Sequence, residues 1–227
     1  MKEFFDAYGI RVRLSSLLIL LGPVIFWIIL FVDETRTLPG MVVISAIVLA
    51  SSAVLVIPMR IKSNEVRDTI FSELPTVTLL SQENHLIDET TRQRYCHKIQ
   101  ERTKIDLSDP NKKDNFKSAI QWLKANYQTS YRNHLVDEEN INFGLLCNLI
   151  GVKKYGISIN VIVAVSTIVH YFCTSKNELT THIVALCVAL IFFFIWVCIV
   201  TKKNIKYSAE KYAIALLSCL DSLNRTN

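Results

Sequence analysis

Four apolar runs that contain no Lys, Arg, Asp or Glu constrain this chain more than any other feature. They form two close pairs and cover residues 14–32, 41–57, 157–173 and 181–200. A helix that rises about 1.5 Å per residue needs about 20 such residues to cross roughly 30 Å of hydrocarbon, and about 17 to 25 are tolerated. The sequence therefore predicts an all-α membrane protein with four transmembrane helices in two hairpins.

The basic residues predict how these hairpins are oriented. Of the 25 Lys and Arg residues, fifteen lie in 58–156, and the short turns 33–40 and 174–180 carry one each. Because cytoplasmic segments are enriched in Lys and Arg, both termini and the middle segment are predicted to lie in the cytoplasm. The first run lacks a small-residue cleavage site before it, so we interpret it as a membrane anchor rather than a signal peptide.

The apolar runs divide the chain into four predicted parts. These are an N-terminal region with the first hairpin (1–59), a cytosolic helical domain (60–156), the second hairpin (157–200) and a C-terminal cytosolic amphipathic helix (201–227). In the cytosolic domain, Pro75 is placed to begin a helix that runs to about Arg102 and bends or breaks near Asp88. An amphipathic helix is predicted over 113–135, because apolar residues recur there at steps of three and four. Those residues are Phe116, Ile120, Leu123, Tyr127, Tyr131 and Leu135.

The segment 137–156 is predicted to be an elbow that joins the cytosolic domain to the third run. Its distinctive residues are Asp137, Glu138, Glu139, Asn140, Leu145, Leu149, Lys153 and Lys154. The acidic residues suit a helix N-terminus, where backbone N–H groups favour negative charge. The two leucines lie four residues apart and share a helix face, which we expect at the bilayer surface, with the lysines at headgroup level. The elbow is either a passive interfacial link or a gate that couples the domain to the spans.

The second apolar run carries a face of small residues made of Ala46, Ala50 and Ala53. Small residues let helices approach closely in lipid, so this face is predicted to pack against another helix. The partner helix lies either in another subunit of a homo-oligomer or in the same hairpin.

Residues that carry chemistry are scattered along this sequence. Asp88 and Glu89 are adjacent, so they point to different sides of a helix. The sequence has no Gly-rich phosphate loop, no zinc-ligand spacing and no nucleophile elbow. We therefore predict no enzyme activity, no metal site and no cofactor. His170 and His182 flank the turn of the second hairpin, where they either titrate together or form a polar cap. Membrane topology and anionic lipids account for most of the +5 charge, so direct binding of nucleic acid is not expected.

Three short motifs accompany this layout of two hairpins and a basic helical insertion. They are Glu139-Asn140-Ile141-Asn142-Phe143-Gly144, Asn148-Leu149-Ile150-Gly151-Val152-Lys153-Lys154-Tyr155-Gly156 and Ala209-Glu210-Lys211-Tyr212-Ala213. Layout and motifs together resemble small multi-span bacterial membrane effectors of anti-phage defence, of the kind associated with retrons or cyclic-oligonucleotide signalling. The resemblance implies an inner-membrane protein that oligomerises or opens when infection is sensed, and then disrupts the lipid bilayer. It also implies that a soluble defence partner or a small signalling ligand binds at 60–156.

Two other functions are compatible with the same sequence. One is a membrane scaffold or adaptor that docks a soluble partner through 60–156. The other is a channel or transporter subunit. A coupled transporter ordinarily places ionisable groups at mid-membrane, and the four apolar runs contain no Asp, Glu, Lys or Arg.

Overall fold

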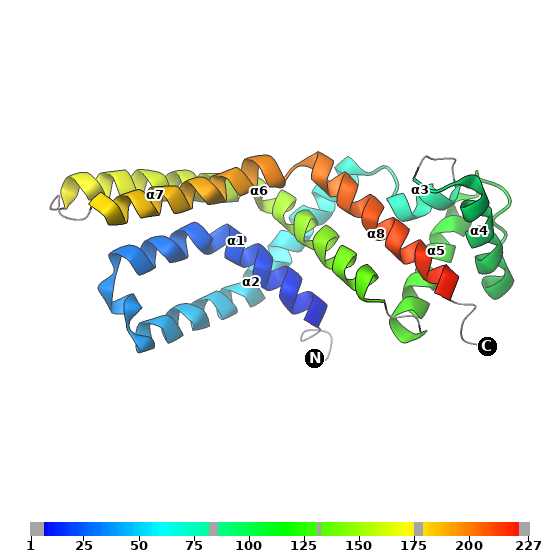
Figure 1. The fold of residues 1–227 in the computed structure, drawn as a ribbon, viewed down its shortest axis with the longest axis horizontal. Helices are drawn as coiled ribbons and strands as arrows, with labels where there is room; N and C mark the ends of the chain where they lie inside the picture. The colour runs from blue at the N-terminus through cyan, green and yellow to red at the C-terminus, as the bar shows by residue number, and fades with distance from the viewer. Residues whose placement is uncertain (1–6, 82–85, 131–132, 175–178, 223–227) are drawn as a thin grey trace. The chain divides into compact units, whose positions relative to one another are not determined.

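The computed structural model of the chain describes residues 7–81, 86–130, 133–174 and 179–222 (Figure 1). Every regular element within these ranges is helical, as predicted. The helices form two compact units. Unit 1 combines Met1–Thr69 with Gly144–Asn204, and unit 2 combines Ile70–Phe143 with Ile205–Asn227. The C-terminal helix, predicted as a separate part of the chain, thus packs for most of its length with the inserted helices.

Unit 1 begins with two long apolar helices joined by a tight turn. α1 covers Ala7–Phe31 and α2 covers Leu38–Ile70, with the 3-10 turn η2 (Asp33–Arg36) between them. Arg36 holds this turn, because its Nε donates to the carbonyl of Ile29 at 3.0 Å and its Nη1 lies 3.1 Å from Asp33 Oδ1. The first of these contacts satisfies a carbonyl that the last turn of α1 leaves without an intrahelical partner.

α2 is bent, whereas α1 continues through its internal Pro23. The segments Leu38–Ser51 and Val54–Ser81, the second of which runs past the end of α2, meet at a bend of 42°. Pro58 explains the position of the bend. A proline in a helix removes the hydrogen bond to the carbonyl four residues earlier, here that of Val54, and its ring clashes with that carbonyl.

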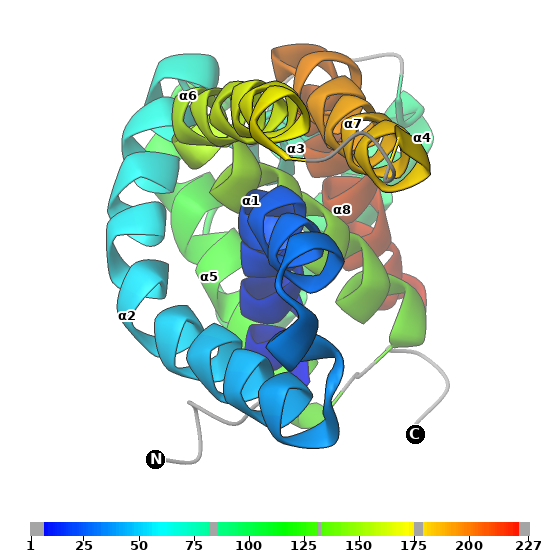
Figure 2. The ribbon, with the colours of Figure 1, turned by 90° about the vertical axis from the view of Figure 1, so that its left-hand side faces the viewer.

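The second helix pair consists of α6 (His134–Cys173) and α7 (Leu179–Phe194), which lie side by side in Figures 1 and 2. α7 passes into a π-helical turn, η4 (Ile195–Ile199). α6 is one unbroken helix of 40 residues, so the predicted elbow at 137–156 is not a separate segment. No proline interrupts α6, and a glycine costs a helix interior only about 1 kcal/mol, which packing can offset.

Three helical segments among the described residues are long and apolar enough to cross a membrane: Arg11–Phe31, His134–Cys173 and Leu179–Ile199. α2 provides a fourth if its two bent segments count as one span. Many large apolar side chains of unit 1 are exposed, including Leu38, Val54, Ile162, Phe172 and Leu190. Such a surface is unfavourable in water and is expected where lipid tails cover it. The structure thus agrees with a multi-pass membrane protein of three to four spans.

Unit 2 is built from shorter and more polar helices. They are α3 (Pro75–Ser81), α4 (Glu89–Thr103), α5 (Lys113–Ser130), the start of α6 and most of α8 (Lys202–Ser222). Pro75 is the first residue of α3, as predicted. The predicted break near Asp88 is also confirmed, because Asp88 is the N-cap of α4 and accepts the backbone N–H of Thr91 at 2.8 Å.

The amphipathic helix predicted from Lys113 to Leu135 is α5, but it is shorter than predicted. Its apolar stripe is buried as far as Tyr127. Tyr131 lies outside the described residues, and Leu135 is 50% exposed in the first turn of α6. A new helix starts there because the side chain of Asn133 accepts the backbone N–H of Leu135 at 3.0 Å.

Candidate functional site

Within unit 1, α6 comes into backbone contact with α2 at Gly151. A Cβ atom added to Gly151 would lie 2.6 Å from the backbone nitrogen of Ser63 and 2.9 Å from the carbonyl carbon of Lys62. Real Cβ atoms do not approach backbone atoms so closely. Only glycine therefore allows these two helices to cross at this separation.

One turn further along α6, Gly156 accommodates an indole ring from η4. A Cβ atom added to Gly156 would lie 2.2 Å from Cε2 of Trp196. Trp196 is fully buried and belongs to a core that unit 1 forms around α6. The other buried members of that core are Leu20, Met59, Leu149, Val152 and Val200. We call the contact of Ser63 and Trp196 with Gly151 and Gly156 the α6 crossing. A π-helical turn, the kind of irregularity often found at functional sites, supplies its tryptophan.

Polar groups also meet at the α6 crossing. Lys153 Nζ donates to the carbonyl of Val200 at 2.8 Å, which places a cation at the end of η4 where the helix dipole is negative. Asn160 Nδ2 donates to the carbonyl of Gly156 at 2.8 Å. The Asn160 Oδ1 and the Trp196 indole N–H are buried, and neither has a hydrogen-bond partner within the described part of the chain. Each such group costs about 1–3 kcal/mol, so the crossing is well packed but incompletely satisfied.

The structure places four of the predicted elbow residues at or beside this crossing. Leu149 is 2% exposed in the unit 1 core, and Leu145 packs against the same core. Lys153 is half-buried and Lys154 is exposed. The two leucines share a helix face as predicted, but placing that face at the bilayer surface was wrong, because it packs against other helices of unit 1. An apolar stripe shows which face of a helix is buried but not what covers it.

The acidic start of α6 belongs to unit 2, where it joins α5. The hydroxyl of Tyr127 lies 2.9 Å from Asp137 Oδ1 and 2.8 Å from the carbonyl of Asn133. Glu138 lies 3.8 Å from the exposed ring of His134, and Glu139 and Asn140 are half-buried. Burial raises the pKa of Tyr127 to about 12, so its hydroxyl stays a donor at neutral pH. Asp137 thus stabilises the junction of two helices.

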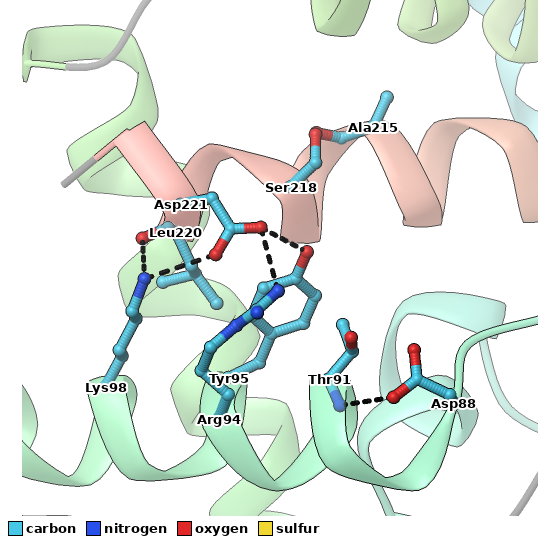
Figure 3. Close-up of polar contacts among 9 residues, drawn as sticks. All are labelled: Asp88, Thr91, Arg94, Tyr95, Lys98, Ala215, Ser218, Leu220 and Asp221. Carbon is cyan, nitrogen blue, oxygen red and sulfur yellow. Dashed lines mark hydrogen bonds and ion pairs between the residues drawn. The ribbon is translucent and has the colours of Figure 1, made fainter. Parts of the chain in front are cut away.

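A second polar cluster, which was not predicted, holds the end of α8 against α4 (Figure 3). Asp221 accepts from the hydroxyl of Tyr95 at 2.9 Å and from Arg94 at 3.2 Å, and its other oxygen lies 3.2 Å from Lys98. Lys98 also donates to the carbonyl of Leu220 at 3.0 Å. The two cations offset the negative end of the α8 dipole. Arg94 and Lys98 are four residues apart, which is a sequence signal, but their partner lies more than 120 residues away.

This cluster makes unit 2 sensitive to alkaline pH. Burial, and after it the hydrogen bond to Asp221, raises the pKa of Tyr95 to about 12. An unfolded tyrosine ionises near pH 10, so the stability that Tyr95 contributes is complete below about pH 10 and is lost as pH rises towards 12. We expect a loss on the order of 2 kcal/mol in pH-dependent unfolding followed by circular dichroism.

The matched variants are Asp221→Asn and Asp114→Asn, since Asp114 is 94% exposed and pairs only with Lys117 among the described contacts. Asp221→Asn removes the charge beside Tyr95, so the stability that is lost between about pH 10 and pH 12 will be smaller than in the wild type. Asp114→Asn will leave that loss unchanged. Equal alkaline profiles for both variants would contradict the assignment.

The small-residue face of the second run lies on the outside of unit 1. Ala46 and Ala50 are exposed in α2, and the side chain of Ala53 lies outside the described residues. The described chain therefore covers neither Ala46 nor Ala50, and their role in helix packing remains a prediction.

Among the described residues, no group of three or more His, Cys, Asp or Glu side chains is arranged to hold a metal ion. The chain matches no protein-family model, no curated protein and no solved structure.

Proposed function

We propose that this protein is a membrane effector in which unit 2 receives a cytosolic signal and unit 1 responds by assembling or opening, so that the membrane barrier is disrupted. The observation that carries the proposal is the sharing of α6. Val136, near the start of α6, is buried in the core of unit 2, and Leu149, further along the same helix, is buried in the core of unit 1. A helix that contributes to both cores couples the packing of one unit to the packing of the other.

The α6 crossing is the part of unit 1 suited to respond. Close-packed helix crossings switch between discrete arrangements rather than deform continuously. A small shift of α6 would separate Gly151 from Ser63 and Gly156 from Trp196, and it would break the bond between Lys153 and Val200. Among the described residues, the buried indole N–H of Trp196 and Oδ1 of Asn160 have no hydrogen-bond partner. A second arrangement of the crossing that gives them partners would recover their desolvation cost.

The proposed location is the bacterial inner membrane, with both termini and unit 2 in the cytoplasm. The lipid bilayer is the main partner, and unit 2 is the proposed docking site for a soluble defence protein or a small signalling ligand. Assembly into a homo-oligomer through Ala46, Ala50 and Ala53 is part of this proposal, since small residues permit close helix packing in lipid.

The orientation predicts which residues are reachable from outside the cell. In a variant without native cysteines, Glu34→Cys in η2 will react with a membrane-impermeant maleimide in intact cells. Asn111→Cys in unit 2 will react only after the membrane is permeabilised. Reaction of Asn111→Cys in intact cells would overturn the orientation, because fifteen of the 25 basic residues would then lie outside.

Induced expression with a membrane-potential dye tests the function. We expect loss of membrane potential and growth arrest, and we expect Lys153→Gln to increase both, because the bond to Val200 that the proposed shift of α6 must break is already absent. Lys154→Gln, at the exposed neighbouring position, is the matched control. Cells that stay polarised with the protein inserted, and a soluble protein that co-purifies with unit 2, would favour a scaffold instead.

A further inference from the structure

Two histidines face each other at the end of the second helix pair. His170 lies in the last turn of α6 and His182 near the start of α7, and both belong to unit 1. His170 Nδ1 is 3.0 Å from His182 Nε2, which is a hydrogen-bond distance. His182 is 3% exposed. The sequence places these residues on either side of a turn, and the structure joins the half-buried His170 to the buried His182.

The ring geometry favours a shared proton over a shared metal ion. The ring centroids are 5.2 Å apart, and this distance exceeds the separation of the two nitrogens by about the radii of two imidazole rings. The two nitrogens therefore point almost directly at one another. Imidazoles that bind one zinc ion instead converge on the ion at the tetrahedral angle, so their nitrogens do not point at each other.

The number of hydrogen-bond donors and acceptors on the two rings limits how many protons the pair can hold. The other nitrogen of His170, Nε2, lies 3.4 Å from the hydroxyl of Thr174. Of the two nitrogens that face each other, one must donate and the other must accept. This arrangement is satisfied with both rings neutral, and it survives one added proton on the outer nitrogen of the donor ring. A second added proton would set two N–H groups face to face and break the bond.

Aromatic rings surround the pair and suit a single positive charge. The ring centroid of Phe31 lies 4.6 Å from that of His170 and 4.9 Å from that of His182. The ring centroid of Trp27 lies 6.2 Å from that of His170. The ring centroid of Tyr171 lies 5.3 Å from that of His182. Aromatic faces attract cations, and a hydrogen bond is stronger when its donor is charged.

Within the described residues, the ring contacts of this pair are mostly with side chains that do not titrate. Its described neighbours are Trp27 and Phe31 on α1, Tyr171 on α6 and Thr174 just after α6. Of these four side chains, only the Tyr171 phenol can titrate. The nearby turn η2 carries Asp33 and Arg36, which pair with each other at 3.1 Å. The α7 run 181–200 contains no Asp, Glu, Lys or Arg.

We propose that His170 and His182 form a proton-binding site that takes up one proton between them, where two independent histidines would take up two. The bound proton gives the otherwise uncharged apolar runs a single positive charge, held between α6 and α7 and against α1. The pH at that end of the hairpin thereby determines whether the histidine pair is neutral or carries one positive charge. This inference concerns unit 1 alone and does not rest on the proposed effector function.

Nitrogen-15 NMR of the full-length protein in lipid nanodiscs, with EDTA present, tests the proposal. The chain has only five histidines, so the imidazole signals can be assigned. At pH 8 we expect a scalar coupling between His170 Nδ1 and His182 Nε2 across their hydrogen bond. Between pH 8 and pH 5 we expect these two rings together to take up one proton, with the coupling retained. His97 and His134, 74% and 90% exposed, serve as internal controls in which no coupling between two rings is expected.

The variant His182→Gln keeps an amide group near the position of Nε2 but cannot titrate. In it, we expect His170 to lose the coupling and to titrate alone. Uptake of two protons by the wild-type pair, uptake of none, or absence of coupling at pH 8 would each overturn the proposal. A change in both imidazole signals on adding Zn²⁺ without EDTA, in preference to proton uptake, would assign a metal site instead and would equally overturn it. If His182→Gln fails to fold, the wild-type spectra still decide the question.

Discussion

Replacing Gly156 by valine will push Trp196 away from α6 and destabilise unit 1 by about 1–3 kcal/mol, the usual cost of overpacking a dense core. The reason is geometric: even the first added carbon would lie 2.2 Å from Cε2 of a fully buried indole. The indole can move only if its neighbours in the same core, among them Leu149 and Val200, move as well. Thermal unfolding in mild detergent, followed by tryptophan fluorescence and circular dichroism, measures the effect.

The matched control is Ser158→Val, two residues further along α6 on an exposed face. It adds a similar side chain where nothing is displaced, so its unfolding temperature should stay near that of the wild type. Trp196→Ala completes a double-mutant cycle with Gly156→Val. Removing the ring leaves a cavity, but valine can then occupy part of it, so the two substitutions together will cost less than the sum of their separate effects. Additive effects would mean that Trp196 does not pack on Gly156 in the membrane.

The helices of this fold follow largely from local sequence signals. Apart from their last residues Val32 and Val200, the four apolar runs lie within α1, α2, α6 and α7 with η4, because uncharged runs of this length satisfy their backbone hydrogen bonds best as helices. Pro75 was predicted to start a helix and Asp88 to mark a bend or break, and both positions follow from short-range chemistry. The continuity of α6 could not be predicted, because the glycines and paired lysines before residue 157 are typical of a link between two separate helices. Packing on both sides of these glycines outweighs their low helix propensity.

The candidate site was predicted only in part. Leu149 and Lys153 were identified as distinctive, yet their partners are Trp196 and Val200, more than 40 residues away in the sequence. Nothing local distinguishes Trp196 from an aromatic residue at a membrane interface, and a π-helical turn has no sequence signature of its own. The two glycines are the one sequence signal that could have located the site. Glycines such as Gly151 and Gly156 within one helix indicate that the backbone of another helix or an aromatic ring packs close against it.

Leu149→Asp will prevent most of the protein from folding in the membrane, at a cost of about 4 kcal/mol or more. Removing a buried leucine side chain costs about 2–5 kcal/mol, and a carboxylate without a partner adds its own desolvation. Leu149 is 2% exposed in the core that holds Met59 and Trp196, so no water or lipid headgroup can solvate the new charge. The quantity to measure is the fraction recovered as a monodisperse species in mild detergent, together with its unfolding temperature.

Leu135→Asp provides the same substitution in the same helix at a position that is 50% exposed, and it should cost less than about 1 kcal/mol. The comparison separates two roles for the segment. If it lay on the bilayer surface, a charge at Leu149 would leave the protein inserted and stable and would change activity alone. Because Leu149 is enclosed by helices of unit 1, stability must fall first, and any loss of activity follows from the lost fold. Equal stability of the two variants would place Leu149 outside the core and would remove the α6 crossing from the proposed mechanism.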